Sequence, residues 1–256
     1  MTVATVDVPT GFRPPIRRLA RAELRLLLRD PVSMFVGVAL PTLVLLVAGA
    51  IPKLRTPDPV FGGVRFIDFF APVLLAISIA LFGLQTLPIG LSTYRERGIL
   101  RRFATTPMRP SALLVVQLAL TIGTAAVATA ILVIVSWLVL DVPLPHHPVA
   151  FVLAFTLGTS AVFALGLLIA ATAPRSRTAA GIGTVAFVLT QFFGGVYLPK
   201  FLLPEILVRV GEFVPPATGT LQGAWTGDDP QWLQMGVMAA IAVVAAGLAV
   251  KLFRWE

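Results

Sequence analysis

Six long apolar stretches alternate with short polar segments along the chain. Each stretch has about twenty residues or more and no charge near its centre, which is enough for a helix to cross roughly 30 Å of hydrocarbon. The pattern therefore predicts an all-α membrane protein with six transmembrane helices, at residues 32–51, 67–91, 111–140, 149–173, 178–196 and 232–250.

The segment before the first apolar stretch is polar. We expect residues 1–15 to form a cytosolic tail, and residues 16–29 to form an amphipathic helix with five arginines on one side and leucines on the other. Glu23 is the exception, because it falls in the apolar arc. A helix of this kind lies in the headgroup plane of a membrane. The alternative is a basic flank that only orients the first span.

A basic island separates the second and third predicted spans. Residues 94–107 read YRERGILRRFATTP and contain four arginines, which cost about 2.5–3.5 kcal/mol each at the bilayer centre and so place the island outside the hydrocarbon. Gly98 breaks the run, Ile99, Leu100 and Phe103 give it an apolar face, and Pro107 ends it. We interpret it as a short surface helix suited to docking on a cytosolic partner. The simpler alternative is a signal that sets topology only.

The segment at 197–231 is rich in proline and holds amphipathic pieces that are too short to span a bilayer. It predicts two short helices that dip into the outer leaflet. An ordinary structured outer loop is the alternative.

Composition and charge agree with this organisation. The chain of 256 residues is 57% hydrophobic and 12% charged, with a mean hydropathy of +0.91, whereas soluble domains carry about 25% charged residues. The net charge is +8, and 15 of the 20 Lys and Arg residues fall in the segments predicted to lie inside. This bias predicts that both termini are cytoplasmic, and it argues against nucleic-acid binding.

The sequence contains no motif for catalysis. It has no phosphate-binding G-x-x-x-x-G-K-[ST] loop, so any ATP use requires a separate chain. No acidic residue lies in the core of a predicted span, which weighs against an ion-coupled carrier. The adjacent His146 and His147 have no carboxylates around them, and there is no cysteine, so we expect no metal site and no catalytic residues.

Two patterns resemble those of ABC-2 type permeases, the membrane subunits of a class of ATP-binding-cassette exporters. The coupling signature of that family, roughly E-R-G-x-L-x-R-x-x-x-T-P, is similar to Glu96-Arg97-Gly98 with Leu100, Arg102, Thr106 and Pro107. The pattern of its re-entrant helix pair is similar to Gly195 and Pro199 followed by Leu203-Pro204-Glu205 and Pro215. One departure is Val116-Gln117, where many relatives have Gly-Lys.

The resemblance implies a single ABC-2 transmembrane domain over 1–256. Residues 1–31 would be the tail and an N-terminal elbow helix, 92–111 a cytoplasmic coupling loop with its coupling helix, and 197–231 an outer re-entrant helix pair before the last span. The chain would be a permease subunit and not an enzyme. It would lie in the bacterial cytoplasmic membrane and export hydrophobic or amphipathic small molecules, as in drug or antibiotic efflux.

The resemblance also implies partners. Two copies of a separate ABC ATPase would carry the ATP and Mg, so that this chain binds no cofactor, and a second permease chain, identical or paralogous, would complete a dimer. The residues expected to couple to the ATPase are Glu96, Arg97, Gly98, Leu100, Arg101, Arg102, Phe103 and Glu23. Alternatives are export of lipid or polysaccharide precursors and a channel or carrier that needs no motor.

A substrate cavity is expected where the second and fifth spans of two subunits face each other. Its predicted lining residues are Phe82, Gln85, Phe187, Gln191 and Phe192. The glutamines also have a structural interpretation, in which each hydrogen-bonds a neighbouring helix.

Overall fold

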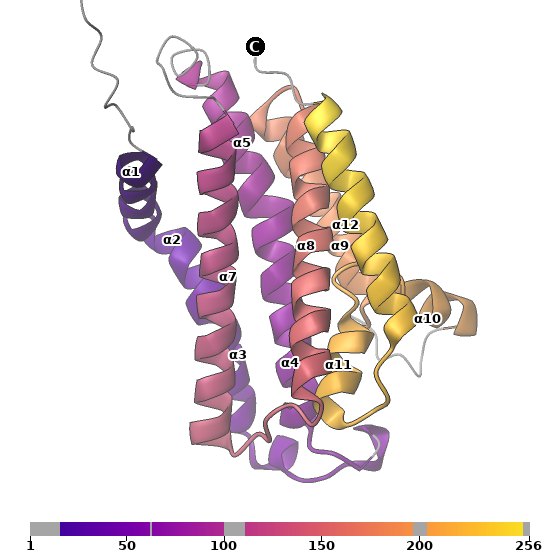
Figure 1. Cartoon of the computed structure of the whole chain (residues 1–256). Coiled ribbons are helices and arrows are strands. Elements are labelled where there is room, and N and C mark those ends of the chain that lie inside the picture. Colours follow the sequence, from indigo (N-terminus) through magenta and orange to yellow (C-terminus); the bar gives the residue numbers. More distant parts are fainter. Residues whose placement is uncertain (1–15, 62, 100–110, 197–203, 253–256) are drawn as a thin grey trace, which may run out of the picture.

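The computed structural model describes residues 16–61, 63–99, 111–196 and 204–252. These residues are helical and contain no strand. The long helices stand side by side as a bundle, with α1 beside one end of it and α11 near the other (Figure 1). The helices are α1 (Ile16–Leu28), α2 (Pro31–Met34), η1 (Phe35–Ala39), α3 (Leu40–Gly49), η2 (Pro52–Arg55), η3 (Pro59–Phe61), α4 (Phe66–Ala80), η4 (Leu81–Thr86), α5 (Leu87–Glu96), α7 (Ser111–Leu140), α8 (Pro148–Thr172), α9 (Ser176–Phe193), α10 (Glu205–Gly211), α11 (Thr218–Thr226) and α12 (Trp232–Leu252).

Within the described residues, four helices are long and apolar enough to cross a membrane. They are Phe66–Glu96, Val115–Leu140, Pro148–Thr172 and Trp232–Leu252, and they correspond to the second, third, fourth and sixth predicted spans. The first predicted span forms α2, η1 and α3, whose apolar part Phe35–Gly49 is shorter. The fifth forms α9, which has 18 residues. A count of six spans therefore stays a prediction.

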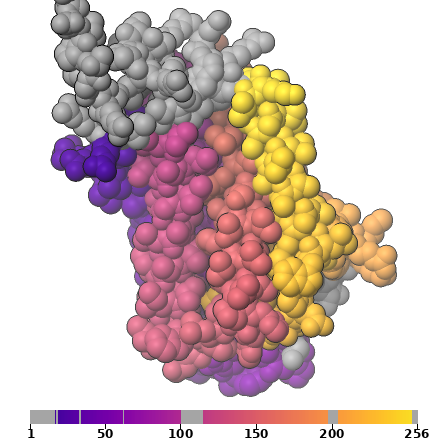
Figure 2. Space-filling view, viewed as in Figure 1, coloured from indigo at the N-terminus to yellow at the C-terminus, as the bar shows by residue number. Residues whose placement is uncertain are grey.

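The continuous helix of α4, η4 and α5 forms the centre of the bundle. Its side chains at Leu75, Ile79 and Leu84 are fully buried, and it packs against α3, α7, α8, α9 and α11. Helices α7, α8 and α12 form the face seen in Figure 2, and they carry exposed large apolar side chains that suit contact with lipid. These side chains include Val127, Ile134, Leu138, Val152, Val243, Val244 and Val250.

Two prolines explain the two π-helical segments. Leu40 and Leu87, which immediately precede Pro41 and Pro88, donate their N–H groups five residues back, to Phe35 and Phe82. Proline has no N–H to continue the ladder, so the backbone before it widens by one residue. Pro41 and Pro88 thus each follow a π segment of the helix.

The π segment η4 is in close contact with neighbouring backbones. A Cβ atom at Gly166 of α8 would overlap the carbonyl oxygen of Gly83, and one at Gly183 of α9 would overlap that of Leu84. Residues without a side chain let helices approach this closely in a membrane. Glycine at these two positions therefore allows α8 and α9 to pack directly on the widened backbone of the second span.

At the end of the bundle away from α1, Arg65 joins α4 to α7. Its guanidinium pairs with Asp68 at 2.8 Å and donates to the Asp141 carbonyl at 2.6 Å, just beyond the C-terminus of α7. The hydrogen bond to Asp68 raises the pKa of Arg65, and a cation also suits the negative end of the helix dipole. Arg55 similarly donates to the Val139 carbonyl at 3.3 Å.

Two short helices separate α9 from α12, where the sequence predicted a pair. α11 is buried against α4 and α8, and its Trp225 makes an edge-to-face contact with Phe151 at 5.4 Å between ring centroids. The backbone N–H groups of His146 and His147 donate to the carbonyls of Trp225 and Ala224. α10 projects from the bundle and exposes Ile206 (Figure 1). The insertion of this pair into a leaflet stays a prediction.

We predict that Gly166→Ala destabilises the protein by about 1–3 kcal/mol, as in other overpacked interiors, because the methyl group forces α8 away from the Gly83 carbonyl. Thermal unfolding of the purified protein in detergent, followed by tryptophan fluorescence, measures the change as a lower midpoint. Gly123→Ala in α7 is the matched control, because a Cβ there meets no atom within 4 Å. Equal midpoints for the two variants would refute the close-packing argument.

Candidate functional site

Two groups of side-chain contacts join distant segments at the end of the bundle that holds α1 and the last turn of α5. The first of them is the Glu23 cluster, which we define as Glu23, Tyr94 and Gln117. The Tyr94 hydroxyl and the Gln117 side-chain amide both donate to Oε2 of Glu23, at 2.7 and 2.6 Å. The cluster thus joins α1, α5 and α7.

The amphipathic pattern of α1 places this carboxylate. Arg17, Arg21 and Arg25 lie on the exposed side of the helix, while Glu23 is only 8% exposed. Leu19 on the same inward side packs against Val116, next to Tyr94. Because a buried carboxylate is costly unless it is hydrogen-bonded, the two donors explain how Glu23 is tolerated on the apolar face. Glu23 thus finds its polar partners within its own chain, and its predicted contact with the ATPase stays a prediction.

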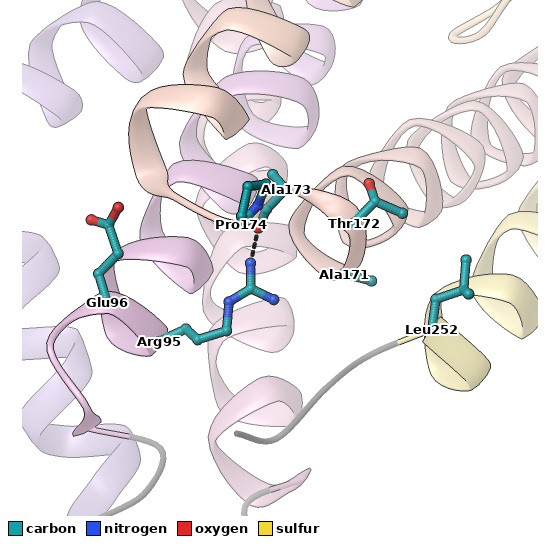
Figure 3. A pocket seen from close by; sticks show the side chains of 7 residues that line it. All are labelled: Arg95, Glu96, Ala171, Thr172, Ala173, Pro174 and Leu252. Carbon is teal, nitrogen blue, oxygen red and sulfur yellow. Dashed lines mark hydrogen bonds between the residues drawn. The ribbon is translucent and has the colours of Figure 1, made fainter.

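The second group of contacts is the helix-end clamp, which we define as Arg95 and Glu96 with the turn between α8 and α9. The Arg95 guanidinium donates to the carbonyl of Ala173, the residue that follows α8 (Figure 3). The Glu96 carboxylate accepts the backbone N–H of Ser176 at 2.8 Å and its hydroxyl at 2.7 Å, at the first residue of α9. A cation at a helix C-terminus and an anion at a helix N-terminus both complement the helix dipoles.

A pocket of about 570 Å³ lies beside the clamp. The Arg95 side chain reaches across it towards Ala173, while the Glu96 carboxylate points away (Figure 3). It is lined by Arg95, Glu96, Ala171, Thr172, Ala173, Pro174 and Leu252. The described residues contain no group of three or more His, Cys, Asp or Glu side chains that could hold a metal ion.

A comparison with protein families identifies the family to which the chain belongs. The model of the ABC-2 type transporter family matches residues 15–220, which run from the start of α1 into α11. The chain belongs to the ABC-2 type transporter family. It is therefore a multi-pass membrane component of an ABC transporter and not itself an enzyme, and members of this family normally work with an ABC ATPase. A comparison with curated proteins gives no significant match.

Some of the predicted coupling residues of this ABC-2 permease lie among the described residues, and the others do not. Tyr94, Arg95 and Glu96 do not begin a separate surface helix, because the second span continues past its predicted end at Leu91 and includes them in α5. Arg97 is exposed, and Gly98 has a φ of +64°, which ends the helix in a turn. The other predicted coupling residues, Leu100, Arg101, Arg102 and Phe103, lie outside the described residues.

The predicted cavity residues do not converge within one subunit. Phe82 is buried with its ring against Gly37, and Phe187 packs on the main core. Phe192 is half-buried and makes an edge contact with Phe193. Gln191 is 1% exposed and finds no hydrogen-bond partner for its amide among the described residues, while Gln85 faces a pocket beside α2. A cavity between two subunits stays a prediction.

Sequence reasoning missed Ser176 and the Ala173 carbonyl. A signal for the serine was present, because serine is favoured at helix N-termini and Ser176 follows the basic turn before an apolar run. Nothing in the sequence pairs it with Glu96, which lies 80 residues earlier.

We predict that Glu96→Ala loosens the start of α9 in this permease, because both acceptors of the Ser176 donors are lost. Hydrogen–deuterium exchange measured by mass spectrometry should show several-fold faster exchange in the first turn of α9. Ser176→Ala removes only the hydroxyl contact and should give a smaller increase in the same peptide.

The matched control is Glu205→Ala, since Glu205 is an exposed carboxylate whose ion pair with Arg209 lies on the surface of α10. Exchange in α9 should be unchanged in this variant. Unchanged α9 exchange in Glu96→Ala as well would contradict the clamp.

Proposed function

We propose that the chain is the permease subunit of an ATP-driven exporter that moves hydrophobic or amphipathic small molecules, such as drugs or antibiotics, out across the bacterial cytoplasmic membrane. Membership of the ABC-2 type transporter family supports the permease role, and the lack of a P-loop in the sequence supports the proposal that a partner holds ATP and Mg. Two ATPase chains and a second permease, identical or paralogous, complete the proposed complex.

One observation carries the coupling proposal. Three consecutive residues in the last turn of α5 contact four other helices. The Tyr94 hydroxyl is hydrogen-bonded to Glu23 of α1 and Gln117 of α7. Arg95 is hydrogen-bonded to the end of α8, and Glu96 to the start of α9. This turn leads directly into the segment that resembles the coupling element of the family. Force applied there by a partner would reach α1, α7, α8 and α9 through these side-chain contacts.

In the proposed cycle, ATP binding closes the two ATPases beneath the permease dimer. The coupling segment and α1, acting as the elbow helix, transmit this movement, and the second and fifth spans of the two subunits open a shared cavity outward. Such a cycle requires the nucleotide state to favour one of two arrangements through differential contacts. In this cycle the α1 end of the bundle and both termini lie in the cytoplasm.

We predict that the tagged permease, purified from its own cells in mild detergent, brings down a P-loop ATPase with measurable ATP hydrolysis. Arg97→Glu should lower the recovered ATPase activity by about tenfold or more, as expected when a charge at an interface is reversed. Arg97 is preferable to Glu96 for this test because Glu96 also supports α9. Mass spectrometry of the eluate identifies the partner and its stoichiometry.

Arg209→Glu is the matched control, because Arg209 is an exposed arginine on α10, far along the chain from the coupling segment. The ATPase activity recovered with this variant should equal that recovered with the unmodified protein. Recovery of a folded permease without any ATPase in several mild detergents would refute the proposal and favour a channel or carrier that needs no motor.

A further inference from the structure

A second cleft lies between the α1–α2 segment and the second span. It has two adjoining lobes, of about 370 and 190 Å³, which share Asp30, Thr86 and Gly90 in their walls. The larger lobe alone is within the range of about 300–1,000 Å³ that is usual for small-molecule sites. We call it the α1–α5 cleft.

The walls of the cleft are apolar over most of their area. Leu26, Val36, Leu81, Leu87 and Leu120 contribute to them, from α1, η1, η4, α5 and α7 respectively. Because α1 is amphipathic with its arginines outward, the orientation proposed above puts the cleft at the level of the inner leaflet. A ligand dissolved in that leaflet would bring its own apolar groups to this wall.

The charge of the cleft is opposite to that of the chain. The described residues that line it include the buried carboxylate of Glu23 and no lysine or arginine, although the chain has a net charge of +8. The donors that hold Glu23, Tyr94 and Gln117, are both neutral and both bond Oε2. Its Oε1 accepts no hydrogen bond from the described residues, and the side chain is nine-tenths buried.

A cation is the ligand that this arrangement favours. An apolar wall lowers the local dielectric constant, so an attraction to a carboxylate is stronger there than in water. Tyr94, an aromatic residue, also lines the cleft. An anion of the same shape would gain the apolar contacts but would be repelled by Glu23.

We propose that the α1–α5 cleft is an access site that selects amphipathic organic cations from the inner leaflet. The proposal rests on the proposed export function, because it names the class of molecule exported and where that molecule first binds. The site is separate from the predicted cavity between subunits, although Gln85 lines its wall.

Gly90 allows the cleft to be filled without disturbing the fold. It lines both lobes, and a Cβ at this position meets no atom within 4 Å. A leucine there projects into open space and replaces glycine inside a helix, where glycine is unfavourable. Gly123→Leu is the matched control, since Gly123 is equally open but lies on the exposed side of α7.

The test measures binding of radiolabelled tetraphenylphosphonium to the purified full-length permease without nucleotide. Specific binding is the part displaced by excess unlabelled probe. It should fall by about tenfold or more in Gly90→Leu, and similarly in Glu23→Gln, but not in Gly123→Leu. Tetraphenylborate has the same shape and the opposite charge, and it should not displace the probe.

Thermal midpoints close to that of the unmodified protein confirm that each variant is folded. Binding that is unchanged in Gly90→Leu, or displaced equally well by tetraphenylborate, overturns the proposal. The two proposals fail separately. Cleft-dependent cation binding without a co-purified ATPase supports the access site and refutes the ATP-driven exporter, whereas a co-purified ATPase with cleft-independent binding overturns the access site alone.

Discussion

Pro88 imposes the constraint on which the packing of the second span depends. A proline inside a membrane helix withholds one N–H, and the carbonyls before it must be accommodated where no water is present. Here the helix widens into η4, and the carbonyls of Gly83 and Leu84 lie against glycines of α8 and α9. Those two helices therefore follow the second span closely along one side.

The other side of the same π segment is left open. Leu81, Gln85 and Thr86 line the α1–α5 cleft, while Gly83 and Leu84 are in the packed interface. The widened turn thus has one face fixed by backbone contacts and one face turned towards α1 and α2. This division explains why Gln85, a predicted cavity residue, faces a cleft, while the neighbouring Phe82 belongs to the core.

The features that the sequence predicts best are those that depend on composition and local pattern. Apolar length located the four long helices, and the distribution of arginine and leucine located α1. The positions of Pro41 and Pro88 marked where the first and second spans deviate, but the π form depends on neighbouring helices, which local sequence does not specify. Because Tyr94 to Glu96 are polar, they were wrongly assigned to the loop after the second span, whereas they form the last turn of α5.

The structure explains that error. Arg95 and Glu96 remain helical because their charges are satisfied by the end of α8 and the start of α9, which lie 78 and 80 residues further along the chain. No local pattern records such a pairing. Glu23 could be predicted to need a polar partner because its position on the apolar face is a local feature, but Tyr94 and Gln117 could not be identified as that partner.

The spacing of these contacts on one helical turn has a mechanical consequence. Consecutive residues of an α-helix point about 100° apart, so Tyr94, Arg95 and Glu96 reach in three directions from the same turn. A displacement of that turn must either break the bonds to the α8–α9 turn or carry this turn along with α5. On the opposite side α5 is bonded to α1 through Glu23. Any movement that shifts α5 together with α8 and α9 must therefore either carry α1 along through Glu23 or break that bond, and only the second changes the width of the α1–α5 cleft.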